Sequence, residues 1–142
     1  MSQLVCWLSC GLVGCRNDKV SKMTIEKFED LDCWKEARVL VKMIYEMLRN
    51  TEKIDRDTAS QIRRAALSVM NNIAEGFGRF GDKEFVRFLN ISSGSAAEVK
   101  SIAYVLEDLN YLTGSESKEI KNQVDQTRKL IHGLIRYLNS KS

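Results

Sequence analysis

The chain has 142 residues and a formal net charge of +3, with no proline and eight glycines. This is about the size of one domain with a continuous hydrophobic core, and the scarcity of turn residues argues against a sandwich or barrel with many tight turns. We therefore expect an all-α protein. From Met23 onward there are 19 basic and 18 acidic residues. Bulk charge thus does not identify a nucleic-acid-binding protein, which would need clustered charge or a patch repeated in an oligomer.

Residues 1–24 are interpreted as a leader, and its apolar run from Leu4 to Val13 is far shorter than the roughly twenty residues of a transmembrane helix. The run could be the core of a secretory signal, since the sequence LVGC ending at Cys15 resembles the lipobox of bacterial lipoproteins. However, no Lys or Arg precedes the run, whereas an ordinary signal peptide begins with a basic segment. We favour Met23 as the true start, which predicts that the leader is disordered or not translated and that the protein is cytoplasmic.

Three of the four cysteines, Cys6, Cys10 and Cys15, fall in the leader, and the fourth is Cys33. No second cluster or nearby histidine completes a tetrahedral zinc site around them. A helical core of this size does not need disulfides either. We expect no metal, no cofactor and no disulfide framework.

The first predicted helix begins after Leu31 and ends near Asn50, where a polar connection follows. Asp30 or Asp32 can cap its start, because a short carboxylate accepts hydrogen bonds from the exposed backbone N–H groups there. Its apolar residues recur at steps of three and four, which places them on one face. They are Trp34, Ala37, Val41, Ile44 and Leu48.

The second predicted helix begins at residues 57–58 and ends near Phe77. We expect Gly76 and Gly78 to end it, because glycine accepts the left-handed conformation that closes a helix. With Gly81 these glycines match the spacing of a dinucleotide-binding fingerprint, but that motif follows a strand, whereas a helix precedes it here. Two adjacent apolar seams run along this helix: Ile62, Ala66, Val69 and Ile73, then Leu67, Met70, Ala74 and Phe77.

The third predicted helix is capped by Asp82 and continues without a breaker to about Leu112. It also carries two apolar seams. The first contains Phe85, Leu89, Ser92, Ala96, Val99, Ala103 and Leu106, and the second contains Phe88, Ile91, Ser95, Glu98, Ile102, Val105, Leu109 and Leu112.

The two seams of the second and third helices are wider than an isolated bundle needs, since one stripe of each helix turns inward. One explanation is a broad face buried within the chain. The other, which we favour, is that part of each face packs against a neighbouring subunit, as in a closed ring.

The fourth predicted helix starts at a capping box formed by Thr113 and Glu116. It shows the clearest heptad of the chain, with Ile120, Val124, Thr127, Ile131, Leu134 and Leu138. Short connections favour antiparallel neighbours. The sequence therefore predicts an up-down-up-down antiparallel four-helix bundle over residues 25–140.

Catalytic patterns are weak in this chain. His132 is the single histidine, with Lys129 three residues before it, so the Glu-x-x-His pairs of di-metal bundles are absent. There is no Gly-x-Ser-x-Gly elbow, and Cys33 has no evident partner base. We expect a protein that is not an enzyme, with His132 as a surface or packing residue.

Polar residues of the second and third helices are interpreted as a structural network that fixes helix register, because buried polar groups must be paired. On the second helix Arg64 shares the face of the network residues. The network residues are Ser68, Asn72, Glu75, Ser95 and Glu98.

Five basic residues near the turn between these helices are candidates for contacting nucleic acid. Arginine forks and a helix N-terminus suit phosphate, although a charged outer face explains the same residues. The candidates are Arg63, Arg64, Arg79, Lys83 and Arg87.

Three motifs together resemble a known family. They are F-x-x-L-x-x-W-x-x-A at 28–37, Q-x-x-R-A-A-x-S-V-x-x-N-I-A-E-G at 61–76 and F-L-x-I-x-x-G-S-x-x-E at 88–98. They resemble the four-helix bundle proteins encoded in intervening sequences of bacterial large-subunit ribosomal RNA genes. The proline that often precedes the second helix in relatives is absent here.

The resemblance implies a bundle that assembles into a ring-shaped homopentamer. Relatives include the accessory variability determinant of diversity-generating retroelements, which binds a reverse transcriptase and nucleic acid through a basic surface. Two functions stay open on this basis. We expect a non-enzymatic oligomeric accessory protein that binds RNA or DNA; the alternative is a scaffold for a protein partner, such as a reverse transcriptase, without nucleic-acid binding.

Overall fold

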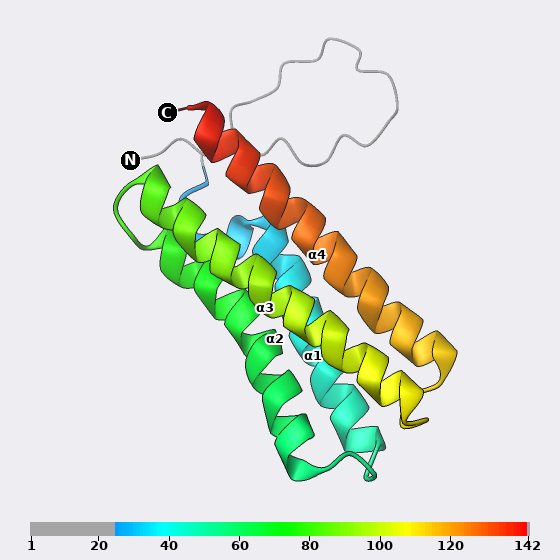
Figure 1. Ribbon diagram of the computed structural model, residues 1–142. Helices are drawn as coiled ribbons and strands as arrows, with labels where there is room; N and C mark the ends of the chain where they lie inside the picture. The colour runs from blue at the N-terminus through cyan, green and yellow to red at the C-terminus, as the bar shows by residue number, and fades with distance from the viewer. Residues whose placement is uncertain (1–24, 142) are drawn as a thin grey trace, which may run out of the picture.

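The computed structural model describes residues 25–141, and within them the protein is all-α, as predicted (Figure 1). A short 3-10 turn, Phe28–Asp30, precedes four long helices. The helices are α1 (Asp32–Asn50), α2 (Arg56–Phe77), α3 (Asp82–Asp108) and α4 (Gly114–Ser140). The leader and its three cysteines lie outside the described residues, so the expectations for them stay predictions.

Each helix packs against two others: α2 contacts α1 and α3, and α4 contacts α3 and α1. Contacts across the seams show that neighbours run in opposite directions. Gly76 near the end of α2 lies against Phe88 near the start of α3, whereas Gln61 near the start of α2 bonds Glu98 further along α3. This is the arrangement of a helix bundle, and it brings the α2–α3 turn and the end of α4 to the same end of the molecule (Figure 1).

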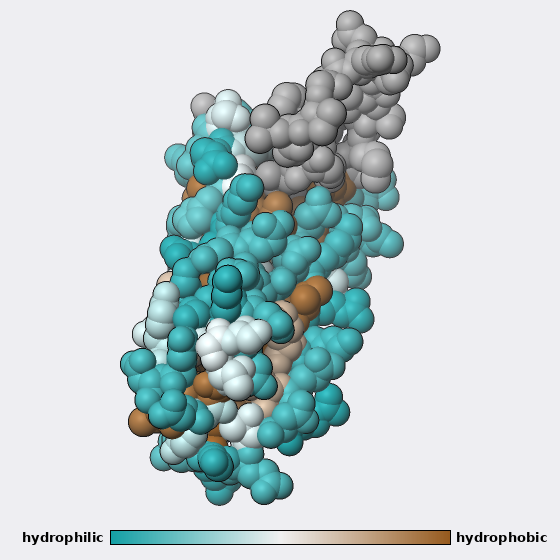
Figure 2. All heavy atoms as spheres, turned by 90° about the vertical axis from the view of Figure 1, so that its right-hand side faces the viewer, coloured by the Kyte–Doolittle hydropathy of each residue, from teal (hydrophilic) through white to brown (hydrophobic). Residues whose placement is uncertain are grey.

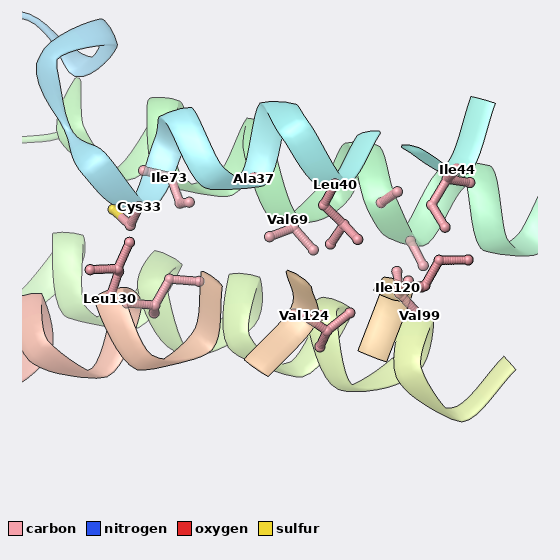
Figure 3. Close-up of a cluster of buried hydrophobic side chains, with 14 of the residues drawn as sticks. Cys33, Ala37, Leu40, Ile44, Val69, Ile73, Val99, Ile120, Val124 and Leu130 are labelled. Carbon is pink, nitrogen blue, oxygen red and sulfur yellow. The ribbon is translucent and has the colours of Figure 1, made fainter. Parts of the chain in front are cut away.

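One apolar core fills the space between the four helices (Figure 3). Leu40 and Ile44 of α1 meet Val69 of α2, Val99 of α3 and Val124 of α4 there. The first seam of α3 is buried throughout, and so is the whole heptad of α4. The helical periodicity therefore predicted the core of both helices correctly.

The predicted cap of α1 is wrong. Leu31 occupies the N-cap position and no side chain caps the helix; Asp32 is the first helical residue and its Oδ1 lies 3.2 Å from Nζ of Lys35. The 3-10 turn provides the entry instead, since the backbone N–H of Leu31 donates to the carbonyl of Phe28. Leu31 is buried, so packing of the entry residue rather than side-chain capping fixes where α1 starts.

The start of α2 does have a carboxylate cap, but it is Asp55. Its Oδ1 accepts a hydrogen bond of 2.9 Å from the backbone N–H of Thr58. This bond, helped by the Thr58 hydroxyl, holds the pKa of Asp55 below its usual value. The predicted start at residues 57–58 is therefore slightly late.

The prediction that Gly76 and Gly78 end α2 in a left-handed conformation is wrong in its geometry. Gly76 is a buried residue inside α2, and Gly78 at the C-cap has a right-handed φ of −76°. The one glycine with a positive φ among residues 25–141 is Gly81, with φ 92° and ψ 142°. It occupies the N-cap of α3, where no side chain caps the helix, so the predicted Asp82 cap is wrong. Gly76 is small because α3 approaches it closely: an added Cβ would lie 2.6 Å from Cβ of Phe88.

Helix α3 ends at Asp108 and not near Leu112 as predicted. Asn110 adopts a φ of 57°, and its N–H donates to the carbonyl of Glu107 at 2.9 Å. The N–H of Tyr111 donates to the carbonyl of Leu106 at 2.9 Å. These two bonds form a Schellman motif, in which asparagine takes the place usually held by glycine.

The capping box of α4 is confirmed. The Thr113 hydroxyl accepts from the backbone N–H of Glu116 at 3.2 Å, and the Glu116 carboxylate accepts from the backbone N–H of Thr113 at 2.8 Å. The N–H of Thr113, together with the Thr113 hydroxyl, which donates to the same carboxylate at 2.9 Å, stabilises the charged carboxylate and lowers the pKa of Glu116. Over residues 25–141, none of the helices combines the length and the apolar character that crossing a bilayer requires.

Candidate nucleic-acid interface

Three of the predicted network residues meet between α2 and α3. The hydroxyls of Ser68 and Ser95 lie 2.8 Å apart. The Asn72 amide donates to the Ser68 hydroxyl at 3.0 Å and to the Ser68 carbonyl at 2.8 Å. These groups are partly buried and satisfy one another, so their hydrogen-bonding capacity is turned inward rather than toward a ligand.

The other two network residues are placed differently. Glu98 forms a separate link between α3 and α2: the Gln61 amide donates to it, and Gln61 in turn accepts from Arg64 at 3.1 Å. Glu75 takes part in neither link, because its carboxylate is exposed and accepts from Arg79 on the same helix at 2.6 Å. The expectation that Glu75 helps to lock α2 to α3 is therefore corrected.

Ser92 supplies a further hydrogen bond between α3 and α2. The Ser92 hydroxyl is fully buried and donates to the carbonyl of Val69 across the seam at 2.7 Å. The sequence placed Ser92 on the core seam but gave no sign of its partner. Within residues 25–141 every buried side-chain nitrogen or oxygen has a hydrogen-bond partner.

Two of the basic candidates converge at the α2–α3 turn. The guanidinium carbons of Arg79 and Arg87 lie 5.4 and 4.9 Å from the ring centre of Phe88. Each arginine also faces a carboxylate: Arg79 pairs with Glu75, and Arg87 lies 3.3 Å from Glu84. Because the pairs are exposed, they contribute little to stability, but they offset the positive charge that would attract phosphate.

The remaining candidates are dispersed. Arg63 lies over the ring of Tyr45 on α1, at 5.5 Å, and so faces away from the α2–α3 seam. Arg64 is exposed and bonds Gln61, near the other end of α2. Lys83 is exposed and makes no hydrogen bond or ion pair with any described residue. The structure thus groups Arg79, Lys83 and Arg87 at one end of the molecule and separates Arg63 and Arg64 from them.

The turn has no net charge when its acidic residues are counted. Between residues 75 and 87 the chain has three acidic residues and three basic ones. The acidic residues are Glu75, Asp82 and Glu84, and the basic ones are Arg79, Lys83 and Arg87. A surface with alternating signs attracts a polyanion less than the list of basic residues alone suggests.

The second half of α4 carries the unbalanced positive charge of the protein. Asp125 is the last acidic residue of the chain, and Lys100 holds it through bonds of 2.7 and 2.8 Å. Beyond it come four basic residues and no acidic one: Arg128, Lys129, Arg136 and Lys141. Figure 2 shows the side of the molecule on which α4 lies, and it is mainly hydrophilic.

The sequence prediction named the basic residues beside the Gly-rich turn and did not include those of α4. The signal was nevertheless present, since a helix that lacks acidic residues over its last four turns stands out once charges of both signs are counted. Lys129 and Arg136 are exposed and have no hydrogen-bond or ion-pair partner among residues 25–141.

The second seam of α3 is open at three positions. Ile91, Val105 and Leu109 are 43%, 49% and 53% exposed, whereas Phe88 and Leu112 of the same seam are buried. A broad face buried within the chain therefore accounts for only part of this seam. By helical spacing the three exposed residues lie on the same side of α3 as Glu98, which bonds Gln61 of α2. At the α2–α3 turn, Phe80 is fully exposed.

His132 is partly buried where α4 meets α3. Its Nε2 lies 3.0 Å from the hydroxyl of Ser93, and Nε of Arg128 donates to the same hydroxyl at 3.3 Å. Within residues 25–141 there is no group of three or more histidine, cysteine or acidic side chains that could hold a metal ion.

Comparison with known proteins places this fold. Residues 29–133 match the family described as 23S rRNA-intervening sequence protein. Among solved structures, the chain is similar to a protein of unknown function from the S23 ribosomal protein family of Bacteroides thetaiotaomicron, with a TM-score of 0.67 and 24% identity over 72% of this chain and 97% of that one. That likeness shows the fold alone. No curated protein matches the chain.

Proposed function

Because the chain belongs to the 23S rRNA-intervening sequence protein family, we propose that it is a non-enzymatic, oligomeric accessory protein that binds RNA or DNA through a basic surface. The observation that carries the proposal is the second half of α4. It has three basic residues, followed by Lys141 at the C-cap, with no acidic residue among them. Lys129 and Arg136 are exposed and have no hydrogen-bond or ion-pair partner in residues 25–141. Lysine and arginine side chains that have no partner can neutralise backbone phosphates and so release the counterions bound there.

The α2–α3 turn lies at the same end of the molecule as this part of α4 (Figure 1). Lys83, which has no ion-pair partner in residues 25–141, supplies a further cation at the turn. Arg79 and Arg87 can exchange their exposed carboxylate partners for phosphate. We therefore place α4 at the centre of the basic surface and the turn at its edge. In a ring of subunits this surface would be repeated, so that modest local charge adds up.

The test is a charge reversal on α4 with a matched control. We expect Lys129→Glu with Arg136→Glu to weaken binding of a single-stranded oligonucleotide at least about tenfold and to make the salt dependence shallower by about two contacts. The control is Lys42→Glu with Lys53→Glu, which changes net charge equally at exposed positions elsewhere. Fluorescence anisotropy between low and moderate salt measures both quantities.

A third variant, with Arg79, Lys83 and Arg87 all changed to Gln, should weaken binding less than the α4 reversal, since two of these cations are already paired. Equal losses in the α4 and Lys42/Lys53 variants would mean that location does not matter and that binding is nonspecific. An unmodified protein that leaves the oligonucleotide unbound at low salt would end the proposal.

The second candidate function is a scaffold that recruits a protein partner, such as a reverse transcriptase, without touching nucleic acid. The open second seam of α3 favours it, since Ile91, Val105 and Leu109 expose apolar surface on one flank. The same seam supports the proposal of a ring-shaped homopentamer, which would cover these side chains with another subunit. Either partner would explain why this seam is apolar.

The oligomer is tested by the molar mass in solution. We expect light scattering after size exclusion to give five times the chain mass of 16.2 kDa. Val105→Asp with Leu109→Asp should reduce the mass to that of one chain, because it places charge on the proposed interface. Asn90→Asp with Ser101→Asp adds the same charge at exposed polar positions of α3 and should leave the assembly intact. A single-chain mass for the unmodified protein at tens of micromolar would contradict the ring.

A further inference from the structure

Ser93, Arg128 and His132 form a small polar cluster at the seam between α3 and α4. Ser93 is 5% exposed, and its hydroxyl is shared between Nε of Arg128 at 3.3 Å and Nε2 of His132 at 3.0 Å. Arg128 and His132 are four residues apart, so they lie on one face of α4 about 6 Å apart along the axis. The buried serine therefore fixes two α4 side chains at once.

The three groups can pair in a consistent way. Arginine can only donate, so its Nε–H occupies one acceptor site of the Ser93 oxygen. The Ser93 hydroxyl can donate its own proton to Nε2 of His132, and in that tautomer Nδ1 carries the imidazole proton. The N–H groups of Arg128 and His132 that Ser93 does not bond are then donors.

The unused donors can be named. The two terminal nitrogens of Arg128 and Nδ1 of His132 have no hydrogen-bond partner among residues 25–141. They are not buried and unsatisfied, so solvent reaches them. The bond from Nε to the Ser93 hydroxyl orients the Arg128 side chain. The two terminal nitrogens of its guanidinium can then make a bidentate contact with an oxyanion.

The charges around the cluster are positive or already paired. Along α4, Lys129 precedes His132 by three residues and Arg136 follows it by four. From α3, Lys100 faces this seam but holds Asp125. Helix α1 packs against α4 through Glu36, whose carboxylate and carbonyl accept from Gln123. No carboxylate of residues 25–141 forms a hydrogen bond or ion pair with Arg128 or His132, so an incoming anion would meet no bound competitor.

We infer that the Ser93, Arg128 and His132 cluster is a phosphate-binding site, with Arg128 and Nδ1–H of His132 as the contacting groups and Ser93 as the positioning residue. The ligand class is a phosphate oxyanion, either as free phosphate or as part of a nucleic-acid backbone. Binding of a nucleic-acid backbone rests on the proposed function, and the cluster would then hold one backbone phosphate at a defined position on the basic surface of α4. Arg128, His132 and Arg136 then offer donors at successive turns of one helix.

The experiment uses the fact that His132 is the single histidine of the chain. In the untagged protein its imidazole gives one set of proton NMR signals, which report on this site directly. Inorganic phosphate and a short single-stranded oligonucleotide are titrated separately at low salt. We expect both to move the imidazole signal, and the oligonucleotide to do so at a concentration at least about tenfold lower, since neighbouring cations add contacts.

Variants separate contact from position. Arg128→Gln should weaken oligonucleotide binding about tenfold, the equivalent of one charge-assisted contact. Ser93→Ala should weaken it less, about threefold, because Arg128 remains but is no longer oriented. Lys100→Gln, on the same seam but with its charge already paired to Asp125, is the matched control and should change binding little. Thermal melting of each variant checks that the fold is kept.

The outcomes are distinguishable. If the oligonucleotide binds but the imidazole signal stays still and Arg128→Gln binds normally, the site is wrong and the proposed function stands. If phosphate moves the signal and no oligonucleotide binds, the anion site stands and the proposed function falls. If neither ligand moves the signal and none binds, both are overturned.

Discussion

Gly76→Ala is expected to lower the free energy of unfolding by about 2 kcal/mol, the middle of the range for overpacked cores. The new Cβ would lie 2.6 Å from Cβ of Phe88 and 2.9 Å from Cδ2 of Phe85. The Phe85 ring can turn, but Cβ of Phe88 is fixed by the backbone of α3. The two helices would therefore have to move apart along a seam that Ser92 and Ser68 also join.

The control is Gly94→Ala on α3, where an added Cβ meets nothing within 4 Å. Both changes restrict the unfolded chain equally and both favour helix, so Gly94→Ala should raise stability by about 0.5–1 kcal/mol. The difference between the two variants isolates the packing at Gly76. Urea denaturation followed by circular dichroism measures it, and equal stabilisation by both alanines would show that α2 and α3 do not meet closely at Gly76.

Cys33 is expected to be about a thousandfold less reactive toward an alkylating reagent in the folded protein than an ordinary cysteine. Burial is the main reason, because desolvation penalises the thiolate and raises the pKa of Cys33 from 9.0 to about 12. The thiolate is the nucleophile, and each unit of pKa lowers its fraction about tenfold at a fixed pH below both values. The side chain is also only 2% exposed, among the core residues of Figure 3.

Peptide-resolved mass spectrometry after a timed pulse of iodoacetamide isolates Cys33 from the other cysteines. The same pulse in denaturant supplies the reference rate, since there the thiol has its ordinary environment. Folded-state labelling that matched the reference would contradict the buried position of Cys33 and, with it, the packing of the start of α1. A slow rate that rises with urea would instead follow the opening of the bundle.

The helical core was predictable because periodicity is a local property. The buried heptad of α4, from Ile120 to Leu138, follows from the spacing of its apolar residues alone, and so does the first seam of α3. The end of α3 was missed because asparagine is a weaker stop signal than glycine. Asn110 takes the left-handed conformation here at a place where Leu109, Tyr111 and Leu112 seemed to continue the helix.

The site was less predictable, and for two different reasons. The pairing of Arg79 with Glu75 and of Arg87 with Glu84 was readable from their spacing, but only the basic residues were weighed. The place of Gly76 was not readable, because the distance between α2 and α3 depends on how two surfaces cross. The same holds for the meeting of Ser93 with Arg128 and His132, which lie far apart in the chain.

The order in which the helices contact one another has a consequence for how the protein folds. Contacts join α1 to α2, α2 to α3 and α3 to α4 across the short connections at 51–55, 78–81 and 109–113. The contact between α1 and α4 alone spans most of the chain. Low contact order of this kind is associated with folding in microseconds to milliseconds. The hairpins of adjacent helices can form first, and the closure of α1 against α4 is then the step that carries the main loop entropy.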